Sequence, residues 1–135
     1  YEDFDRRQNA LIDAAMAAAG RRLAERAAVV AACYVECVLT QGREIPDVLS
    51  SLESTPELAA VKRQYQLDFM EKFRGWFAPF VAPPGLSPAT MWGMLGAADA
   101  ISSAVVTGDI SQQEGMQEIS ALIIATVGRF SAASG

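Results

Sequence analysis

The chain contains no histidine among its 135 residues. Histidine is the commonest general acid or base in enzymes and a frequent zinc ligand, so its absence disfavours both acid–base catalysis and a zinc centre. The sequence also has no glycine-rich phosphate loop, no Glu-x-x-His pair for two metal ions and no nucleophile with a histidine base. We therefore expect no enzyme, no bound metal and no cofactor.

Positive charge is scarce as well. Eleven Lys and Arg residues against sixteen Asp and Glu residues give a formal net charge of -5. Nucleic-acid binding depends on neutralising phosphates, so we do not expect this segment by itself to hold DNA or RNA. Apolar runs long enough to cross a bilayer are missing, because the longest candidates contain Glu36 or Asp99 or are broken by glycine. Since no signal peptide is recognisable, we expect a cytoplasmic protein with no membrane partner.

There are only two cysteines, Cys33 and Cys37, one helical turn apart in an apolar segment. Two interpretations stay open. The favoured one is that both are small buried hydrophobic residues; the other is a redox pair or a reactive thiol that lines a pocket.

Helical periodicity is present throughout, and no strand-like alternation persists. We predict an all-α domain, a helical bundle of about six helices with short connections. Residues that favour caps and first turns mark the starts at Asp5, Thr55-Pro56, Ser87-Pro88 and Ser111. Gly42 and Thr107-Gly108-Asp109 are predicted ends, and Pro79 should kink or end its helix. The expected helices cover residues 5–19, 22–41, 46–53, 55–82, 87–107 and 111–130.

The last two predicted helices carry more apolar surface than one small core needs. One of them has a row of small residues, and the other is apolar nearly all round. Such helices are buried on several sides, and a second copy of the same hairpin is the simplest cover. We predict a homodimer whose interface is a four-helix bundle formed by Gly93, Gly96, Ala97, Ala100, Ala104, Leu122, Ile123, Thr126, Val127 and Phe130.

Large aromatic residues step by three or four along the predicted helix 55–82. Such a row usually fills a core, but facing Ala-rich and Gly-rich helices it can also leave a ligand pocket. Asp99 stands alone in an apolar helix, where it either meets the ligand or pairs with an arginine or a hydroxyl. The predicted pocket residues are Tyr34, Cys37, Tyr65, Phe69, Met70, Phe73, Trp76, Met91, Trp92, Leu95 and Asp99.

The opening segment, Tyr1-Glu2-Asp3-Phe4-Asp5-Arg6-Arg7-Gln8-Asn9-Ala10-Leu11, resembles a junction in the tetracycline-repressor (TetR) family. In that family a Tyr-x-His-Phe segment ends the DNA-recognition helix, and a Lys and a Leu pair follow in the connecting helix. Tyr1, Phe4 and Leu11 match, and Arg7 stands where Lys is usual. The departures are Asp3 for His, Arg6 for Ser and Ala10 for the first Leu.

The remainder of the chain is similar to the regulatory domain of that family. The order of helices agrees, the Gly108-Asp109-Ile110-Ser111 turn is followed by Glu114 in register, and Asp99-Ala100 is similar to a common Asp-Gly pair. The family's last two helices form a dimer, as the helix faces suggested here. The similarity to the Asp-Gly pair implies that Asp99 serves the fold.

The resemblance implies a ligand-responsive transcriptional regulator, usually a repressor. Residues 1–4 would end the recognition helix, and residues 5–135 would form the ligand-binding and dimerisation domain. Because the chain begins at Tyr1, we expect a longer parent protein that contacts operator DNA through residues before it. A hydrophobic small-molecule inducer would move the connecting helix and change the spacing of two DNA-reading heads. Two alternatives stay open: a structural oligomerisation module without a ligand, and an enzyme that holds an exogenous cofactor in the bundle.

Overall fold

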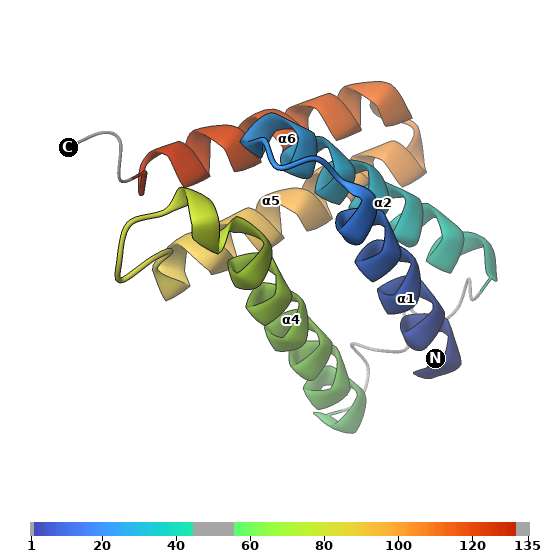
Figure 1. The fold of residues 1–135 in the computed structure, drawn as a ribbon. Coiled ribbons are helices and arrows are strands. Elements are labelled where there is room, and N and C mark those ends of the chain that lie inside the picture. Colours follow the sequence, from blue (N-terminus) through green and yellow to red (C-terminus); the bar gives the residue numbers. More distant parts are fainter. Residues whose placement is uncertain (1, 45–55, 132–135) are drawn as a thin grey trace.

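The computed structural model describes residues 2–44 and 56–131, and all regular structure in these ranges is helical (Figure 1). The predicted all-α class is therefore confirmed for this part of the chain. The short helix expected at residues 46–53 lies outside the described residues. The helices are α1 Glu2–Ala18, α2 Leu23–Glu44, α4 Pro56–Phe77, the short 3-10 helix η1 Ala78–Phe80, α5 Pro88–Thr107 and α6 Gln112–Gly128.

The predicted hairpin of α5 and α6 is confirmed in its local chemistry. The Ser87 hydroxyl accepts a hydrogen bond from the Thr90 N–H at 3.2 Å, and Pro88 occupies the first turn. Gly108 ends α5 in the left-handed conformation, with a φ of 84°. The Ser111 hydroxyl then accepts from the Glu114 N–H at 3.0 Å and starts α6. Each of these caps satisfies backbone groups that a helix end leaves without partners.

Several predicted boundaries are wrong. Helix α1 runs through Asp5 without a break, and α2 continues past Gly42 to Glu44. Asp and Gly can occupy helix interiors at a modest cost, so they end a helix only where the chain also turns there. Helix α4 stops at Phe77, and Pro79 falls in η1, as a proline that cannot continue an α-helix requires.

Helix α2 is the centre of the bundle and packs against α1, α5 and α6. Its buried stripe places Ala27 and Ala31 where neighbouring helices can approach, with Val30 and Val35 filling the space between them. Burial of the predicted α5 face, which includes Met91, is confirmed. These four α2 residues belong to one buried core, whose other members are Met70, Phe73, Phe77, Leu86, Met91, Met94, Leu95, Ala98, Ile119, Ile123 and Val127.

Helix α4 is held to the bundle mainly at its C-terminal end. The Arg26 guanidinium of α2 donates to the Trp76 carbonyl at 2.8 Å and lies 5.6 Å from the centre of the Phe80 ring. A cation at this end of a helix satisfies free carbonyls and favours the helix dipole. The other end of α4 projects away from α5 and α6, on the same side of the bundle as α1 (Figure 1).

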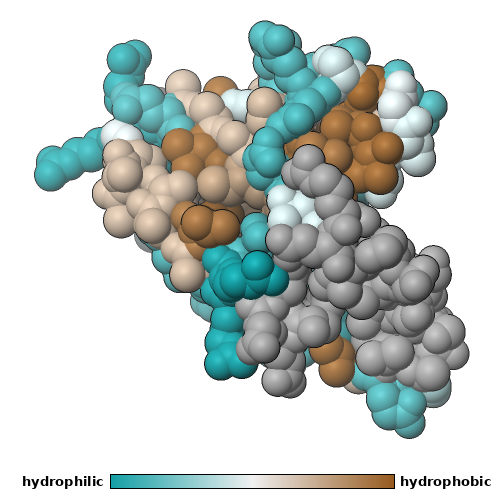
Figure 2. All heavy atoms as spheres, turned by 90° about the vertical axis from the view of Figure 1, so that its right-hand side faces the viewer, coloured by the Kyte–Doolittle hydropathy of each residue, from teal (hydrophilic) through white to brown (hydrophobic). Residues whose placement is uncertain are grey.

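Hydrophobic residues also reach the surface of the described part of the chain. The face in Figure 2 shows two such areas in its upper half, with hydrophilic side chains between them. Among the large apolar side chains, Leu11 is 62% exposed and Val106 46%. Apolar patches of this kind mark places where a protein meets a ligand or a partner.

The turn at Gly108 makes the first testable prediction. Gly108→Ala should lower the free energy of unfolding by about 1–2 kcal/mol, because a Cβ is disfavoured at positive φ. The matched control is Gly75→Ala, in the middle of α4, where an added Cβ would have no neighbour within 4 Å. This control should raise stability by about 0.5–1 kcal/mol. Chemical denaturation measures both, and equal stability of the two variants would contradict the left-handed turn.

Candidate functional site

A cleft of about 270 Å³ lies between α1, α2 and α4. Its walls combine aromatic and aliphatic side chains with a few polar groups, which is the usual composition of a small-molecule site. Helices α2 and α4 supply its aromatic rings, and α1 supplies aliphatic and amide side chains. The lining residues are Gln8, Asn9, Leu11, Ile12, Ala32, Cys33, Tyr34, Glu36, Cys37, Tyr65, Asp68 and Phe69.

Four of the predicted pocket residues line this cleft: Tyr34, Cys37, Tyr65 and Phe69. The wall that α1 provides and the charged rim were not predicted from the sequence. One signal was available, since Leu11 and Ile12 are apolar residues beside the amides Gln8 and Asn9. Periodicity alone does not tell which neighbour a helix packs against, so α1 was not assigned to the pocket.

The space where the sequence placed the pocket, between α4 and α5, is almost filled. Only about 20 Å³ remains there, room for about one water molecule. Met70, Phe73, Met91 and Leu95 line this internal space and are buried core residues. Methionine is flexible enough to fill irregular gaps between helices. The ligand-sized volume therefore lies on the α1 side of Tyr34 and Phe69.

Trp76 and Trp92 do not line the cleft. Trp76 packs edge-on against Phe69, with the ring centres 5.8 Å apart, so it touches the cleft wall from behind. Trp92 is exposed on α5, and the Arg63 guanidinium lies 5.5 Å from the centre of its ring. The two tryptophans therefore report on different parts of the molecule.

Tyr34 forms the partition between the cleft and the internal space and lines both. Its ring meets Phe69 edge-to-face, with centres 5.4 Å apart, and its hydroxyl donates a hydrogen bond to the Asp99 carboxylate. Asp99 therefore has the hydroxyl partner that one interpretation expected. Burial raises the pKa of Asp99, while the Tyr34 hydrogen bond and the charge of Lys62 act in the opposite direction.

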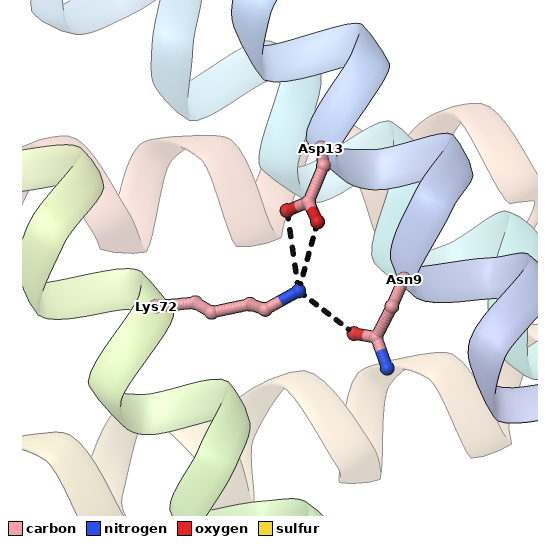
Figure 3. Close-up of polar contacts among 3 residues, drawn as sticks. All are labelled: Asn9, Asp13 and Lys72. Atoms are coloured by element: carbon pink, nitrogen blue, oxygen red, sulfur yellow. Dashed lines mark hydrogen bonds and ion pairs between the residues drawn. The ribbon is translucent and has the colours of Figure 1, made fainter.

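Lys72 joins α4 to α1 at the edge of the cleft (Figure 3). Its ammonium donates to the Asp13 carboxylate at 3.1 Å and to the Asn9 side-chain carbonyl at 3.2 Å. Asn9 also lines the cleft, so a molecule bound there would contact a residue that also binds Lys72. Its side chains are partly exposed, 33% for Lys72 and 55% for Asp13, so the ion pair contributes about 0–1 kcal/mol. Contacts of this strength position α1 but still allow it to move.

Cys33 and Cys37 are both half-buried, and both line the cleft. Burial, followed by the nearby charge of Glu36, raises the pKa of the Cys33 thiol. A raised pKa keeps the thiol protonated and unreactive. In the described ranges no three His, Cys, Asp or Glu residues gather in a way that could hold a metal ion.

The predicted interface residues divide into three groups. Gly93, Gly96 and Ala100 are exposed on one face of α5, while Ala97, Ala104, Leu122, Thr126 and Phe130 are half-buried. Ile123 and Val127 are 1% and 0% exposed inside the core of this chain, so assigning them to an interface was wrong. The second half of α6, residues 121–128, is apolar nearly all round, so its outward face could not be identified from that half of its sequence. The exposed apolar and small residues of α6 are Ala121, Ile124, Ala125 and Gly128.

Helix α5 is also the one helix of the described segments that is long and apolar enough to cross a membrane. Length and composition alone are weak evidence, since core helices of soluble proteins meet the same criteria.

Comparisons with protein-family models, with curated proteins and with solved structures found no match for this chain.

The half-buried Asp99 carboxyl makes the second prediction. Because its pKa is raised in the folded chain, its contribution to stability is complete below the ordinary aspartate pKa and is lost as pH rises through the raised value. Asp99→Asn keeps an acceptor for Tyr34 and removes this titration. The stability of the wild type relative to Asp99→Asn should therefore fall from acidic to neutral pH, by about 1.4 kcal/mol per unit of raised pKa.

Urea denaturation across this pH range measures the difference. Asp109→Asn, which also removes a carboxylate, at an exposed residue of the α5–α6 turn, is the control. A pH-independent difference for Asp99→Asn would contradict the proposed burial of the charge.

Proposed function

We propose that this chain is the ligand-binding and dimerisation domain of a ligand-responsive transcriptional regulator of the TetR type, most simply a repressor. The observation that carries the proposal is the cleft of about 270 Å³ that α1 shares with α2 and α4. In the sequence, the segment that begins α1 resembles the junction between a DNA-recognition helix and a connecting helix. A molecule in this cleft would contact the helix that leads to the DNA-binding head.

The position of the cleft suggests how a ligand would act. Leu11 and Ile12 of α1 form one wall. Asn9 lines the cleft and also accepts a hydrogen bond from Lys72. A ligand with greater affinity for one tilt of α1 would shift the population toward that tilt. In a dimer, the same change in both copies would alter the distance between two DNA-reading heads and thus the fit to two operator half-sites.

The exposed face of α5 supports the dimeric part of the proposal. Gly93, Gly96 and Ala100 follow one another at intervals of three and four residues. Apart from neighbouring residues and the backbone of α5 itself, no described atom lies within 4 Å of a Cβ added at either glycine. Small residues at this spacing let a second helix approach closely. Exposed Ile124 and Ala121 of α6 extend the apolar surface. A two-fold pair of these hairpins would cover it, and the same face would meet itself.

A purely structural oligomerisation module is the alternative function. It requires the same exposed face of α5 but no cavity of ligand size. The almost complete filling between α4 and α5 favours this alternative, whereas the cleft beside α1 favours a ligand-binding domain. We give the cleft more weight, because its volume and its mixed aromatic and polar lining match those of small-molecule sites.

The third prediction tests the dimer. Gly96→Leu should weaken self-association by about 1–3 kcal/mol, because overpacking at a close helix contact is destabilising. Within one chain the added side chain has free space, so the fold of the single chain should be unaffected. Gly75→Leu on α4, which also has free space, is the control. Analytical ultracentrifugation over a range of concentrations measures the effect, and a wild-type chain that stays monomeric would refute the dimer.

The fourth prediction tests the cleft as a ligand site. N-phenyl-1-naphthylamine, a neutral hydrophobic fluorophore, should bind and quench Trp76, which lies against the wall residue Phe69. Phe69→Ala should weaken this binding about tenfold or more, since a large ring in a pocket often contributes 2 kcal/mol or more. Leu67→Ala removes an exposed apolar side chain of α4 outside the cleft and should leave binding unchanged.

Fluorescence titration gives the affinities, and a Trp92→Phe variant isolates the signal of Trp76. Both alanine variants should keep the association state of the wild type. Equal affinity of Phe69→Ala and the wild type would remove the cleft from consideration as the site. Native mass spectrometry of the purified protein is an independent test for a bound small molecule.

A further inference from the structure

The charged groups that line the cleft are all acidic. Glu36 of α2 and Asp68 of α4 line it and are exposed at its rim, whereas no lysine or arginine is among the lining residues. Exposed carboxylates carry negative charge at neutral pH. Lys72 adjoins the cleft through Asn9, but the Asp13 carboxylate 3.1 Å away offsets its charge. The lining therefore has a net negative potential.

Neither rim carboxylate is neutralised by a neighbour. The side-chain amide of Gln112 donates to Glu36, and that of Gln64 donates to Asp68 at 2.9 Å. Both donors are neutral, and within residues 2–44 and 56–131 no ion pair forms with either carboxylate. A cation that entered the cleft and displaced water would therefore meet two charges that are not already compensated.

The walls between the carboxylates are aromatic and aliphatic. Tyr34 stands on α2, and Tyr65 and Phe69 stand on α4, so rings come from two sides of the cleft. Aromatic ring faces attract cations. Leu11 and Ile12 of α1 supply apolar surface for the rest of a molecule. Such a site suits a ligand that is both hydrophobic and positively charged.

The Cys33 thiol adds no competing chemistry. The pKa of Cys33 is raised by burial and by Glu36, so this side chain stays a neutral, polarizable part of the wall. A neutral thiol neither supplies a further negative charge nor attacks an electrophile. The polar recognition in the cleft thus rests on the carboxylates, the tyrosine hydroxyls and the amides.

We propose that the cleft binds a lipophilic cation, meaning an aromatic or bulky apolar molecule that carries a quaternary or protonated nitrogen or a phosphonium centre. The proposal rests on the proposed function, since the site is the same cleft, and it adds the chemical class of the ligand. The cationic centre lies near the Glu36 and Asp68 rim, and the apolar body lies against Phe69 and α1.

Two ions of the same shape and opposite charge provide the test. Tetraphenylphosphonium should bind the dimeric wild-type protein about tenfold or more tightly than tetraphenylborate, as expected for carboxylates partly screened by water. Its affinity should fall as ionic strength rises, because the carboxylates are at the surface. Quenching of Trp76 in the Trp92→Phe variant, confirmed by calorimetry, gives both dissociation constants.

Charge-removing variants locate the effect. The double variant Glu36→Gln/Asp68→Asn should weaken phosphonium binding about tenfold or more and leave the affinity for neutral N-phenyl-1-naphthylamine unchanged, because only the Coulomb attraction is removed. Asp109→Asn removes the same kind of charge outside the cleft and should not alter either affinity. Circular dichroism and ultracentrifugation show whether the double variant keeps its fold and association state.

The outcomes separate this proposal from the proposed function. Borate binding as tight as phosphonium binding, or an unchanged phosphonium affinity in the double variant, overturns the cationic ligand while the cleft remains a ligand site. If the double variant does not fold, the preference for phosphonium over borate in the wild type and its salt dependence decide the matter. If neither ion binds, the cationic ligand is refuted, and the neutral probe and Gly96→Leu judge the proposed function separately.

Discussion

The structure depends on the close packing of α2 against α5 and α6. Small residues on α2, Ala27 and Ala31, are fully buried and allow neighbouring helices to approach its backbone. Gly115 does the same for α6, since a Cβ there would lie 2.6 Å from Val105. Once α2, α5 and α6 fill this core, α1 and α4 are left to pack at its side. That arrangement leaves room for a cleft. One wall of this cleft is α1, which is held to the bundle less tightly than the core helices are held to one another.

The hold on α1 and α4 is lighter than the packing of the core. Lys72 of α4 contacts Asp13 and Asn9 of α1 through side chains that are all at least partly exposed. Arg26 fixes only the C-terminal end of α4, through the Trp76 carbonyl. Elements with few buried contacts open and shift at lower free energy than core helices do. The proposed regulatory function would use this combination of a rigid core and one movable wall.

The sequence was sufficient for the helical class and for the α5–α6 hairpin, because their signals are local. Ser87, Gly108 and Ser111 act on backbone groups within a few residues, so their effect can be predicted without the fold. It was insufficient for the pocket, because Tyr34 and Phe69 each border both the filled and the open side. Which side is filled depends on the packing of three methionines and on the position of α1. Both are set by tertiary structure and have no local signal in the sequence. The outward face of α6 was missed for a similar reason, since its second half has apolar residues on all sides and shows no preferred direction.

The dependence of α2 on α6 has a consequence for biosynthesis. Helix α2 is made early, yet the helix that packs most extensively against it, α6, is the last one described in the chain. While α6 is still being translated, Val30 and Val35 of the emerging polypeptide lack part of their final cover. Nascent chains with such exposed apolar stripes are prone to aggregate and are substrates for chaperones. Folding of this domain is thus coupled to the completion of its synthesis, and a ribosome that stalls within α5 leaves a chain without a closed interior.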